Sequence, residues 1–308
     1  MYDLVIIGAG PAGLAAAVYA ARQKIDFIMI SSNIGGQTIL SSDVENYLGH
    51  HKLSGLDLVN KFKEHLKDYE IDLKEGEKVS DIEKLEKGLK VITDKAEYET
   101  KTVLIVSGKQ PRKLGVPGED KLSRKGVTYC ATCDAPIFAG KDVAVIGGGN
   151  AALDAALLSA KYANKIYMIN INPEFTGDKS LVDEVSKSDK IEVFFNAETT
   201  EILGGKFVEG VKFRINGKEQ ELKVQGVIVE IGSIPSAGFD KLTEKNKWNE
   251  IIIHEDKERY ISNLTSVDGI FAAGDVTDVP EKQIIVAAGE GVKAVLGIFK
   301  YLNKPVRW

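Results

Sequence analysis

YDLVIIGAGPAG, residues 2–13, opens the chain, and KDVAVIGGGNAA, residues 141–152, repeats its pattern. In each copy a short apolar run reaches a group of glycines, and an alanine-rich stretch follows. A second apolar run then comes at residues 25–30 and 165–169. This order is typical of a strand, a crossover helix and a parallel strand. The repeat therefore predicts an α/β protein with two Rossmann-like dinucleotide-binding domains.

The glycines of the first copy stand where a dinucleotide-binding turn requires them. Gly8 allows the tight turn out of the strand, Gly10 lets the backbone approach a pyrophosphate, and Gly13 lets helix and strand pack closely. Unpaired N–H groups at the helix start then face the anion. A single motif of this kind is a weak indication, but two copies, each between strand and helix, count against an accidental loop. The residues expected at a second nucleotide site are Gly147, Gly149, Asn150 and Ala151.

The rest of the chain suggests how the two domains are connected. Residues 78–93 and 201–224 alternate apolar and charged positions, which predicts small antiparallel hairpins. Residues 111–118 and 241–250 have the composition of linkers. We therefore expect residues 1–112 and 246–308 to form one discontinuous domain, and residues 113–245 to form a second domain inserted in it. Each domain is expected to be a three-layer ββα unit.

Composition excludes several classes of protein. Hydrophobic residues make up 44% and charged residues 28%, which argues against a disordered or fibrous chain. A net charge of -5 argues against nucleic-acid binding. The N-terminus lacks the basic start of a signal sequence, and no apolar run is long enough to span a membrane. We expect a cytoplasmic protein that binds neither membranes nor nucleic acids.

Cys130 and Cys133 are the only cysteines, and they form one Cys-x-x-Cys. This spacing allows a small disulfide ring that opens and closes, and such motifs commonly lower the pKa of one thiol. Two inert buried thiols or half of a zinc site are the alternatives. Zinc would need two further ligands, which the four scattered histidines do not supply, so we expect no metal.

The motifs together resemble the low-molecular-weight thioredoxin reductases, FAD enzymes of the class-II pyridine nucleotide-disulfide oxidoreductase fold. They equally resemble the flavoprotein component of alkyl hydroperoxide reductase without its N-terminal extension. The stretch GVTYCATCD, residues 126–134, just before the second glycine turn, discriminates best. Further matching pieces are residues 8–13, 35–37, 44–47, 274–276, 283–289 and 291.

The resemblance implies an FAD site in the first domain and a role for each matching residue. The pyrophosphate would lie over the first glycine turn, Asp275 would contact the ribityl chain, and a helix N-terminus would stabilise the reduced flavin. The alternative for Gln37 and Asn46 is that they are ordinary turn residues. The implied cofactor residues are Gly8, Gly10, Pro11, Ala12, Gly13, Gly35, Gly36, Gln37, Asn46, Gly274, Asp275, Gln283 and Ile284.

The resemblance also implies how the cysteines act. Cys133 receives electrons from the flavin, Cys130 attacks the disulfide of a thioredoxin or thioredoxin-like protein, and Asp134 exchanges protons. Relatives rotate the inserted domain between these two contacts, and we expect the same here. Family habit also predicts a homodimer.

The electron donor is where the sequence departs from the family pattern. NADPH-dependent relatives carry several arginines after the second strand of the inserted domain, whereas residues 170–176 read NINPEFT. Without those cations a 2′-phosphate loses its charge-assisted contacts, so we expect NADPH not to be the donor. NADH is one alternative, with Asn170 or Glu174 at the ribose. Reduced ferredoxin is the other.

A ferredoxin donor would favour a basic docking surface. The candidate docking residues are Lys61, Lys63, Lys67, Lys109, Arg112 and Lys113, which are equally well explained as solvated side chains. Trp308 could stack over the flavin, although chain ends more often fray. The competing functions are a thioredoxin-reductase-like ferredoxin/NAD(P) flavin oxidoreductase, which would lack the cysteine pair, and an NADH-dependent reductase of a peroxiredoxin system.

Overall fold

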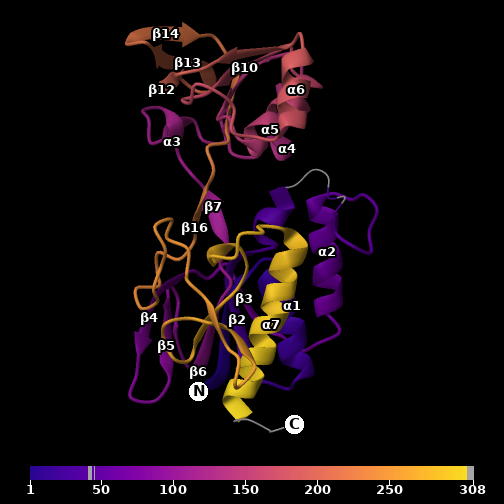
Figure 1. Ribbon diagram of the computed structural model, residues 1–308, viewed down its shortest axis with the longest axis vertical. Coiled ribbons are helices and arrows are strands. Elements are labelled where there is room, and N and C mark those ends of the chain that lie inside the picture. The colour runs from indigo at the N-terminus through magenta and orange to yellow at the C-terminus, as the bar shows by residue number, and fades with distance from the viewer. Residues whose placement is uncertain (41–43, 45, 304–308) are drawn as a thin grey trace. The chain divides into compact units, whose positions relative to one another are not determined.

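The computed structural model describes residues 1–40, 44 and 46–303, except for the side chains of Leu40, Thr132 and Cys133. The chain divides into two compact units, which are Met1–Gln110 with Ile234–Trp308, and Pro111–Ser233 (Figure 1). We call them unit 1 and unit 2. Trp308, the residue considered for stacking on the flavin, lies outside the described residues.

A nine-stranded sheet forms the centre of unit 1. Its main path runs β17-β18-β19-β6-β1-β2-β3, and β5 joins β4 to β6. The strands are β1 (Tyr2–Ala9), β2 (Phe27–Ile34), β3 (Asp72–Glu75), β4 (Val79–Lys84), β5 (Leu89–Thr93), β6 (Glu97–Ile105), β17 (His254–Asp256), β18 (Ile261–Leu264) and β19 (Ile270–Ala272). The helices are α1 (Pro11–Arg22), α2 (Gly55–Leu66), α7 (Ile284–Asn303) and the 3-10 helices η1 (Gly36–Leu40) and η3 (Gly274–Val276).

The apolar run of β1 is buried on both sides of this sheet. Leu4 and Ile6 pack with α1 and α7 in one core, and Val5 and Ile7 pack with β4 and β5 in another. Such two-sided burial explains why the strand is uniformly apolar rather than alternating. β1 pairs in parallel with β2 and β6, and β4 pairs antiparallel with β5.

Unit 2 repeats this plan around a five-stranded parallel sheet of order β11-β10-β9-β15-β8. Its strands are β8 (Val127–Thr128), β9 (Asp142–Ile146), β10 (Lys165–Ile169), β11 (Ile191–Phe194) and β15 (Gly226–Val229). A three-stranded antiparallel sheet contains β12 (Ala197–Gly204), β13 (Val208–Ile215) and β14 (Lys218–Leu222). The helices are α3 (Glu119–Leu122), α4 (Ala131–Asp134), the 3-10 helix η2 (Ala135–Phe138), α5 (Asn150–Ala160) and α6 (Lys179–Lys187). The α/β class and both antiparallel hairpins agree with the expectations from sequence.

The second unit boundary lies earlier than the expected position after residue 245. Unit 2 ends at Ser233, and the short strands β7 (Lys109–Pro111) and β16 (Ser233–Pro235) pair where the chain passes between the units. The residues that follow belong to unit 1, because Ala237, Phe239 and Leu242 pack in the core that contains Val5 and Ile7. Asp240 is 3% exposed, and it forms an ion pair of 3.0 Å with Lys245.

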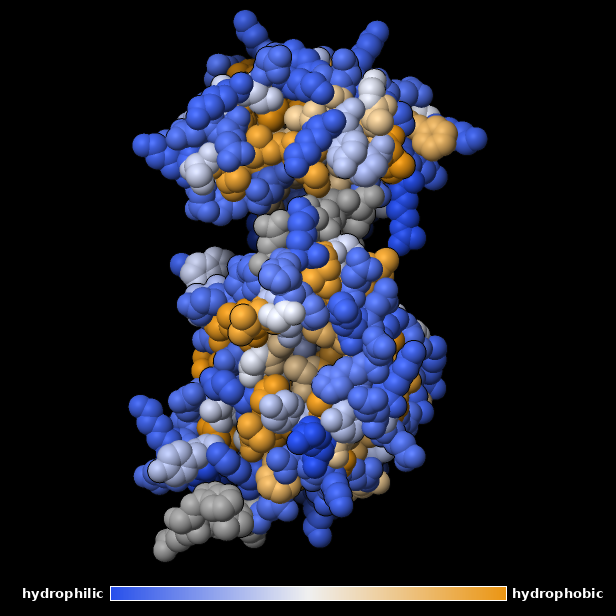
Figure 2. Space-filling view, turned by 90° about the vertical axis from the view of Figure 1, so that its right-hand side faces the viewer, coloured by the Kyte–Doolittle hydropathy of each residue, from blue (hydrophilic) through white to orange (hydrophobic). Residues whose placement is uncertain are grey.

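Among the described residues, none of the helices combines the length and apolar character needed to cross a bilayer. Hydrophilic residues dominate the face of each unit seen in Figure 2, and apolar residues occur there in small groups.

Close packing of α7 on α1 gives a test of the unit 1 core. A Cβ atom at Gly291 would lie 2.0 Å from the carbonyl oxygen of Ala12, whereas a Cβ at Gly289 would have no neighbour within 4 Å. We expect Gly291→Ala to destabilise the protein by about 1–3 kcal/mol through overpacking. Gly289→Ala, on the exposed side of the same helix, should be neutral or stabilising by up to about 1 kcal/mol. Urea denaturation of both variants measures the difference, and equal midpoints would refute this account of the packing.

Candidate functional site

The first glycine turn joins β1 to α1 and leaves the start of the helix open. Gly8 has φ +117°, and a Cβ at Gly13 would lie 2.0 Å from the Gly8 carbonyl oxygen. A Cβ at Gly10 would meet nothing within 4 Å. Gly10 is the N-cap of α1 and Pro11 its first residue, with no side-chain cap and no acid in the first turn. The first amides of α1 therefore face a space that an anion can occupy.

Residues distant in sequence converge around this turn. A Cβ at Gly36 would lie 3.4 Å from the Cα of Gly10, and one at Gly274 would lie 3.1 Å from the Cβ of Ala12. Gly35, with φ +99°, turns the chain from β2 into η1. Each of these glycines permits a close approach between segments.

Two of the expected cofactor residues are joined directly. The side-chain amide of Asn46 donates a 3.1 Å hydrogen bond to the side-chain carbonyl oxygen of Gln283. Gln283 immediately precedes α7, which begins at Ile284. Both side chains are exposed, so they lie at the surface of unit 1.

Asp275 lies in η3 between two lysines. Its carboxylate is 3.8 Å from the Lys109 ammonium, and its carbonyl oxygen accepts a 3.4 Å hydrogen bond from Lys282. Burial raises the pKa of Asp275, while the charges of Lys109 and Lys282 oppose that shift. Gln37 donates its side-chain N–H to the carbonyl oxygen of Lys109.

These features fit the pyrophosphate and ribityl chain of a dinucleotide flavin. An uncapped helix start with open space before Gly10 suits the diphosphate. Asp275 offers a partly buried hydrogen-bond acceptor to a polyol, and its carboxylate lies 3.8 Å from the Lys109 ammonium. The site lies beyond the carboxyl ends of β1 and β19, where open parallel sheets place their ligands.

The Cys-x-x-Cys motif begins immediately before α4 in unit 2. Cys130 is half-buried and disulfide-bonded, and Cys133 is the only other cysteine in the chain. The Cys130 N–H donates a 3.1 Å hydrogen bond to the Thr128 hydroxyl. Asp134, half-buried at the end of α4, donates its N–H to the Cys130 carbonyl oxygen at 3.2 Å.

A buried glutamate supports the segment that leads into this motif. Glu119 is 2% exposed, and it accepts hydrogen bonds from the N–H groups of Leu114 and Gly115 at 2.8 and 2.7 Å. It also accepts a 2.7 Å hydrogen bond from the hydroxyl of Tyr129. The residue before Cys130 is thereby tied to the chain that enters unit 2.

The second glycine turn, after β9, has the same backbone plan but a different environment. Gly147 has φ +137°, and Gly149 is the N-cap of α5. The side chain of Asn150 is not available to a ligand, because it donates a hydrogen bond to the Asp178 carboxylate and accepts one from the Asp178 N–H. Ala151 is exposed in the first turn of α5.

Asn170, the residue considered for binding a ribose, is used internally. Its side chain is 1% exposed, donates to the carbonyl oxygen of Glu174 at 2.9 Å and accepts from the N–H of Asn172 at 3.1 Å. A Cβ at Gly148 would lie 2.4 Å from this amide group. Asn170 therefore holds its own loop against the glycine turn.

The lysines considered for ferredoxin docking do not share one role. Lys109 faces Asp275, and Lys113 forms a 2.6 Å ion pair with Asp120. Lys61, Lys63 and Lys67 belong to α2 or its C-cap. These contacts favour local roles for Lys109 and Lys113.

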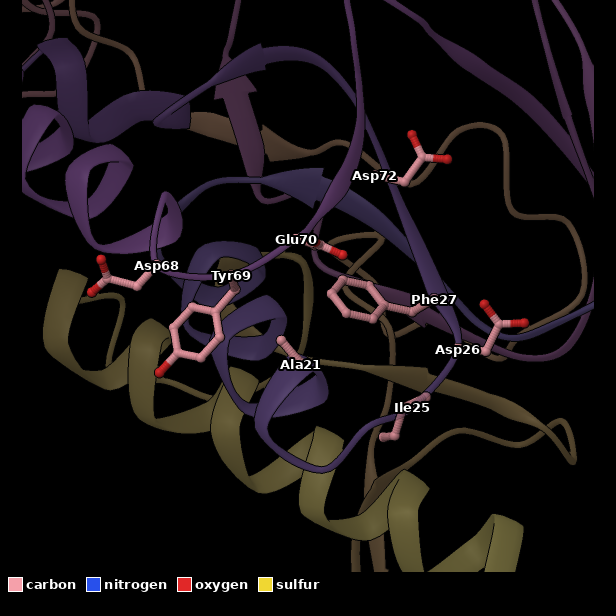
Figure 3. A pocket seen from close by; sticks show the side chains of 8 residues that line it. All are labelled: Ala21, Ile25, Asp26, Phe27, Asp68, Tyr69, Glu70 and Asp72. Atoms are coloured by element: carbon pink, nitrogen blue, oxygen red, sulfur yellow. The ribbon is translucent and has the colours of Figure 1, made fainter.

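A cavity of about 430 Å³ in unit 1 has none of the expected site residues in its lining (Figure 3). It is at the amino ends of β2 and β3, opposite the edge where such sheets bind ligands. The acids lining it are Asp26, Asp68, Glu70 and Asp72. An acidic lining disfavours an anionic cofactor in this cavity. Among the described residues, no cluster of His, Cys, Asp or Glu is suited to hold a metal ion.

The sequence analysis did not identify Lys282 and Glu230, which lie at the carboxyl edges of the unit 1 and unit 2 sheets. Lys282 lies beside the expected Gln283, and Glu230 directly follows the apolar strand β15. A charged residue at the carboxyl end of a buried parallel strand was the available signal for Glu230.

Comparison with known proteins extends these observations to whole chains. The family model described as pyridine nucleotide-disulphide oxidoreductase matches residues 2–291. The F component of the alkyl hydroperoxide reductase of Escherichia coli (strain K12) is 38% identical over 309 residues, covering 98% of this chain and 58% of that protein. This chain thus spans less than two thirds of that relative.

Two solved structures match over nearly their full length. Thioredoxin reductase of Lactococcus lactis has a TM-score of 0.88 and 30% identity, covering 99% of this chain and 100% of that one. A ferredoxin-flavin thioredoxin reductase of Clostridium acetobutylicum has a TM-score of 0.53 and 31% identity, covering 99% of each chain.

These similarities confirm the expected fold, two Rossmann-type domains, and FAD as the cofactor. The family is one of FAD-dependent disulfide oxidoreductases, as the motifs implied. The chain belongs to the pyridine nucleotide-disulphide oxidoreductase family.

Proposed function

We propose that the protein is an FAD-dependent protein-disulfide reductase that passes electron pairs through Cys130 and Cys133 to a thioredoxin or thioredoxin-like protein. The observation that carries this proposal is the Cys130 disulfide at the start of α4, followed by Asp134, in a unit inserted into the FAD-binding unit. A purely structural disulfide requires neither a neighbouring acid nor partial exposure at the carboxyl edge of a parallel sheet, whereas a disulfide that exchanges with a partner uses both.

Bound FAD supplies the two electrons that reduce the disulfide. Residues of the first glycine turn would hold its pyrophosphate, and Asp275 would accept hydrogen bonds from its ribityl chain. The other proposed contacts are those of Gly36, Gln37, Asn46 and Gln283.

The cysteines perform the exchange with the partner. Reduction breaks the bond between their sulfurs and leaves one thiolate and one thiol, with one proton taken up. The Cys130 thiolate attacks the partner disulfide and expels one partner sulfur, and Asp134 supplies a proton to that sulfur. The Cys133 sulfur, after losing its proton, displaces the mixed disulfide, so the second partner sulfur leaves and the original bond re-forms.

The donor proposed is one without a 2′-phosphate, either NADH or reduced ferredoxin. Residues 170–176 contain no cation, and the Asn170 side chain is occupied by its own loop. A relative named for ferredoxin supports the second donor. Docking of ferredoxin on the α2 lysines stays a prediction.

A second candidate function is that of a peroxiredoxin-system reductase, favoured by the identity with the alkyl hydroperoxide reductase component. It differs in the protein that receives the electrons. The ferredoxin/NAD(P) flavin oxidoreductase alternative is disfavoured by the cysteine pair. A homodimer is proposed because related enzymes are usually dimers. A cytoplasmic location is proposed because the two cysteines suit reversible chemistry rather than a structural disulfide.

Matched glycine variants test which turn holds FAD. In Gly10→Ala the new methyl group enters the space proposed for the pyrophosphate, so FAD affinity should fall at least about tenfold. The apoprotein should keep its stability, because that Cβ meets nothing within 4 Å. Gly149→Ala makes the same change at the second turn and should leave FAD binding intact. Flavin absorbance per chain and fluorescence titration measure both, and loss of FAD in Gly149→Ala alone would reverse the assignment.

Donor use and cysteine function can be tested in one anaerobic experiment. NADPH, NADH and reduced ferredoxin are offered separately to the wild type and to Cys133→Ser, and the flavin absorbance is followed. We expect bleaching by NADH or by ferredoxin, and bleaching by NADPH at least about tenfold weaker because charge-assisted phosphate contacts are missing. The flavin of Cys133→Ser should be bleached by the same donors as that of the wild type, yet the variant should fail to reduce thioredoxin. Efficient bleaching by NADPH would refute the donor proposal, and thioredoxin reduction by Cys133→Ser would refute the cysteine assignment.

A further inference from the structure

Glu230 is a half-buried carboxyl group with no role in the reaction proposed above. It follows β15, and its N–H donates a 2.8 Å hydrogen bond to the carbonyl oxygen of Ile146 in β9. A Cβ at Gly147 would lie 2.1 Å from the Glu230 carbonyl oxygen. Glu230 is therefore fixed at the carboxyl edge of the unit 2 sheet, against the second glycine turn.

The side chain of Glu230 reaches the redox motif. Its carboxylate accepts a hydrogen bond from the backbone N–H of Ala131. Ala131 is 5% exposed, follows Cys130 directly and begins α4. The carboxyl group is thus held by the peptide that carries the Cys130 carbonyl.

The surroundings of Glu230 set its charge. Burial is the main reason that the pKa of Glu230 is raised to about 7; the Ala131 hydrogen bond opposes this shift, and the charge of Asp154 adds to it. Asp154 belongs to α5, and its own pKa is raised by burial and by the charges of Asp178 and Glu184. From α4, the contact is the uncharged Ala131 amide. With the disulfide closed, the carboxyl group changes charge near neutral pH.

We propose that Glu230 is a positioning residue that couples opening of the Cys130–Cys133 bond to proton uptake. This inference rests on the proposed exchange at these cysteines. Opening the bond with two electrons and one proton leaves one thiolate and one thiol. The new negative charge close to Glu230 favours its protonated form, so near neutral pH a fraction of a second proton is taken up there. When the thiolate attacks a partner disulfide, its charge disappears and Glu230 releases that fraction.

The test measures the dithiol:disulfide ratio of the holoprotein in glutathione buffers by rapid alkylation. In this equilibrium two glutathione molecules become glutathione disulfide as the protein disulfide becomes a dithiol. The ratio is followed from about pH 5.5 to about pH 8.5, the range over which a group with a pKa near 7 changes charge. Far-UV circular dichroism and flavin content verify that each variant is folded.

Glu230→Gln keeps an acceptor for the Ala131 N–H but cannot ionise. At the acid end, where Glu230 is protonated in both redox states, the variant and wild type should have equal ratios. At the alkaline end the variant should hold about threefold more dithiol, since a mutual interaction of about half a pKa unit is a factor of three. Glu209→Gln, an exposed residue of β13, is the matched control and should follow the wild type throughout.

Asp154→Asn provides a second variant at an exposed position. Because the Asp154 charge raises the pKa of Glu230, its removal should move the bend of the pH curve to lower pH while leaving Glu230 ionisable. Superimposable curves for wild type and Glu230→Gln, or an offset constant over the whole pH range, would overturn the inference while the proposed function stands. A pair that never exchanges with glutathione in any variant would overturn both.

Discussion

Both units depend on one constraint, the close backbone packing at the glycine turn that ends a buried parallel strand. In unit 1 the Gly13 position comes within 2.0 Å, measured from a hypothetical Cβ, of the Gly8 carbonyl oxygen. In unit 2 a Cβ at Gly147 would lie 2.1 Å from the carbonyl oxygen of Glu230, which follows the neighbouring strand β15. A side chain at Gly13 would separate helix from strand, and one at Gly147 would separate the ends of β9 and β15. In either case the unpaired helix amides would lose the place from which they meet a ligand. The binding edge of each unit follows from this contact.

The two equivalent edges nevertheless differ in charge. In unit 1 the ammonium groups of Lys109 and Lys282 are balanced by the carboxylates of Asp275 and Glu250, and the helix start is open. In unit 2 the carboxylates of Asp178, Asp154 and Glu230 lie around the second turn. Acidic groups repel the phosphates of a nucleotide. They therefore favour an electron donor that does not depend on many phosphate contacts. The same acids provide proton-binding groups beside the cysteine motif.

Sequence patterns predicted the elements whose causes are local. The repeated strand, glycine turn and helix, and the alternating hairpins, follow from apolar periodicity and glycine spacing. The second boundary was misplaced because composition does not reveal that Asp240 is buried and paired with Lys245. Lys109 was considered as a docking residue, yet it contacts Asp275, which is far along the chain. Asn170 was considered for a ligand, and its loop uses it instead. The contact of Lys109 with Asp275 is tertiary, and the short-range contacts of Asn170 and Asp240 depend on loop conformations that apolar periodicity does not encode.

The central claim is that flavin and disulfide form one redox chain within a single polypeptide. Anaerobic titration of the flavin-loaded protein with dithionite counts the electrons it takes. The account predicts two electron pairs per bound flavin in the wild type, and one pair in a Cys130→Ser, Cys133→Ser double variant with unchanged flavin content. One pair in both proteins would show that the sulfur bridge takes no part, and would contradict the account.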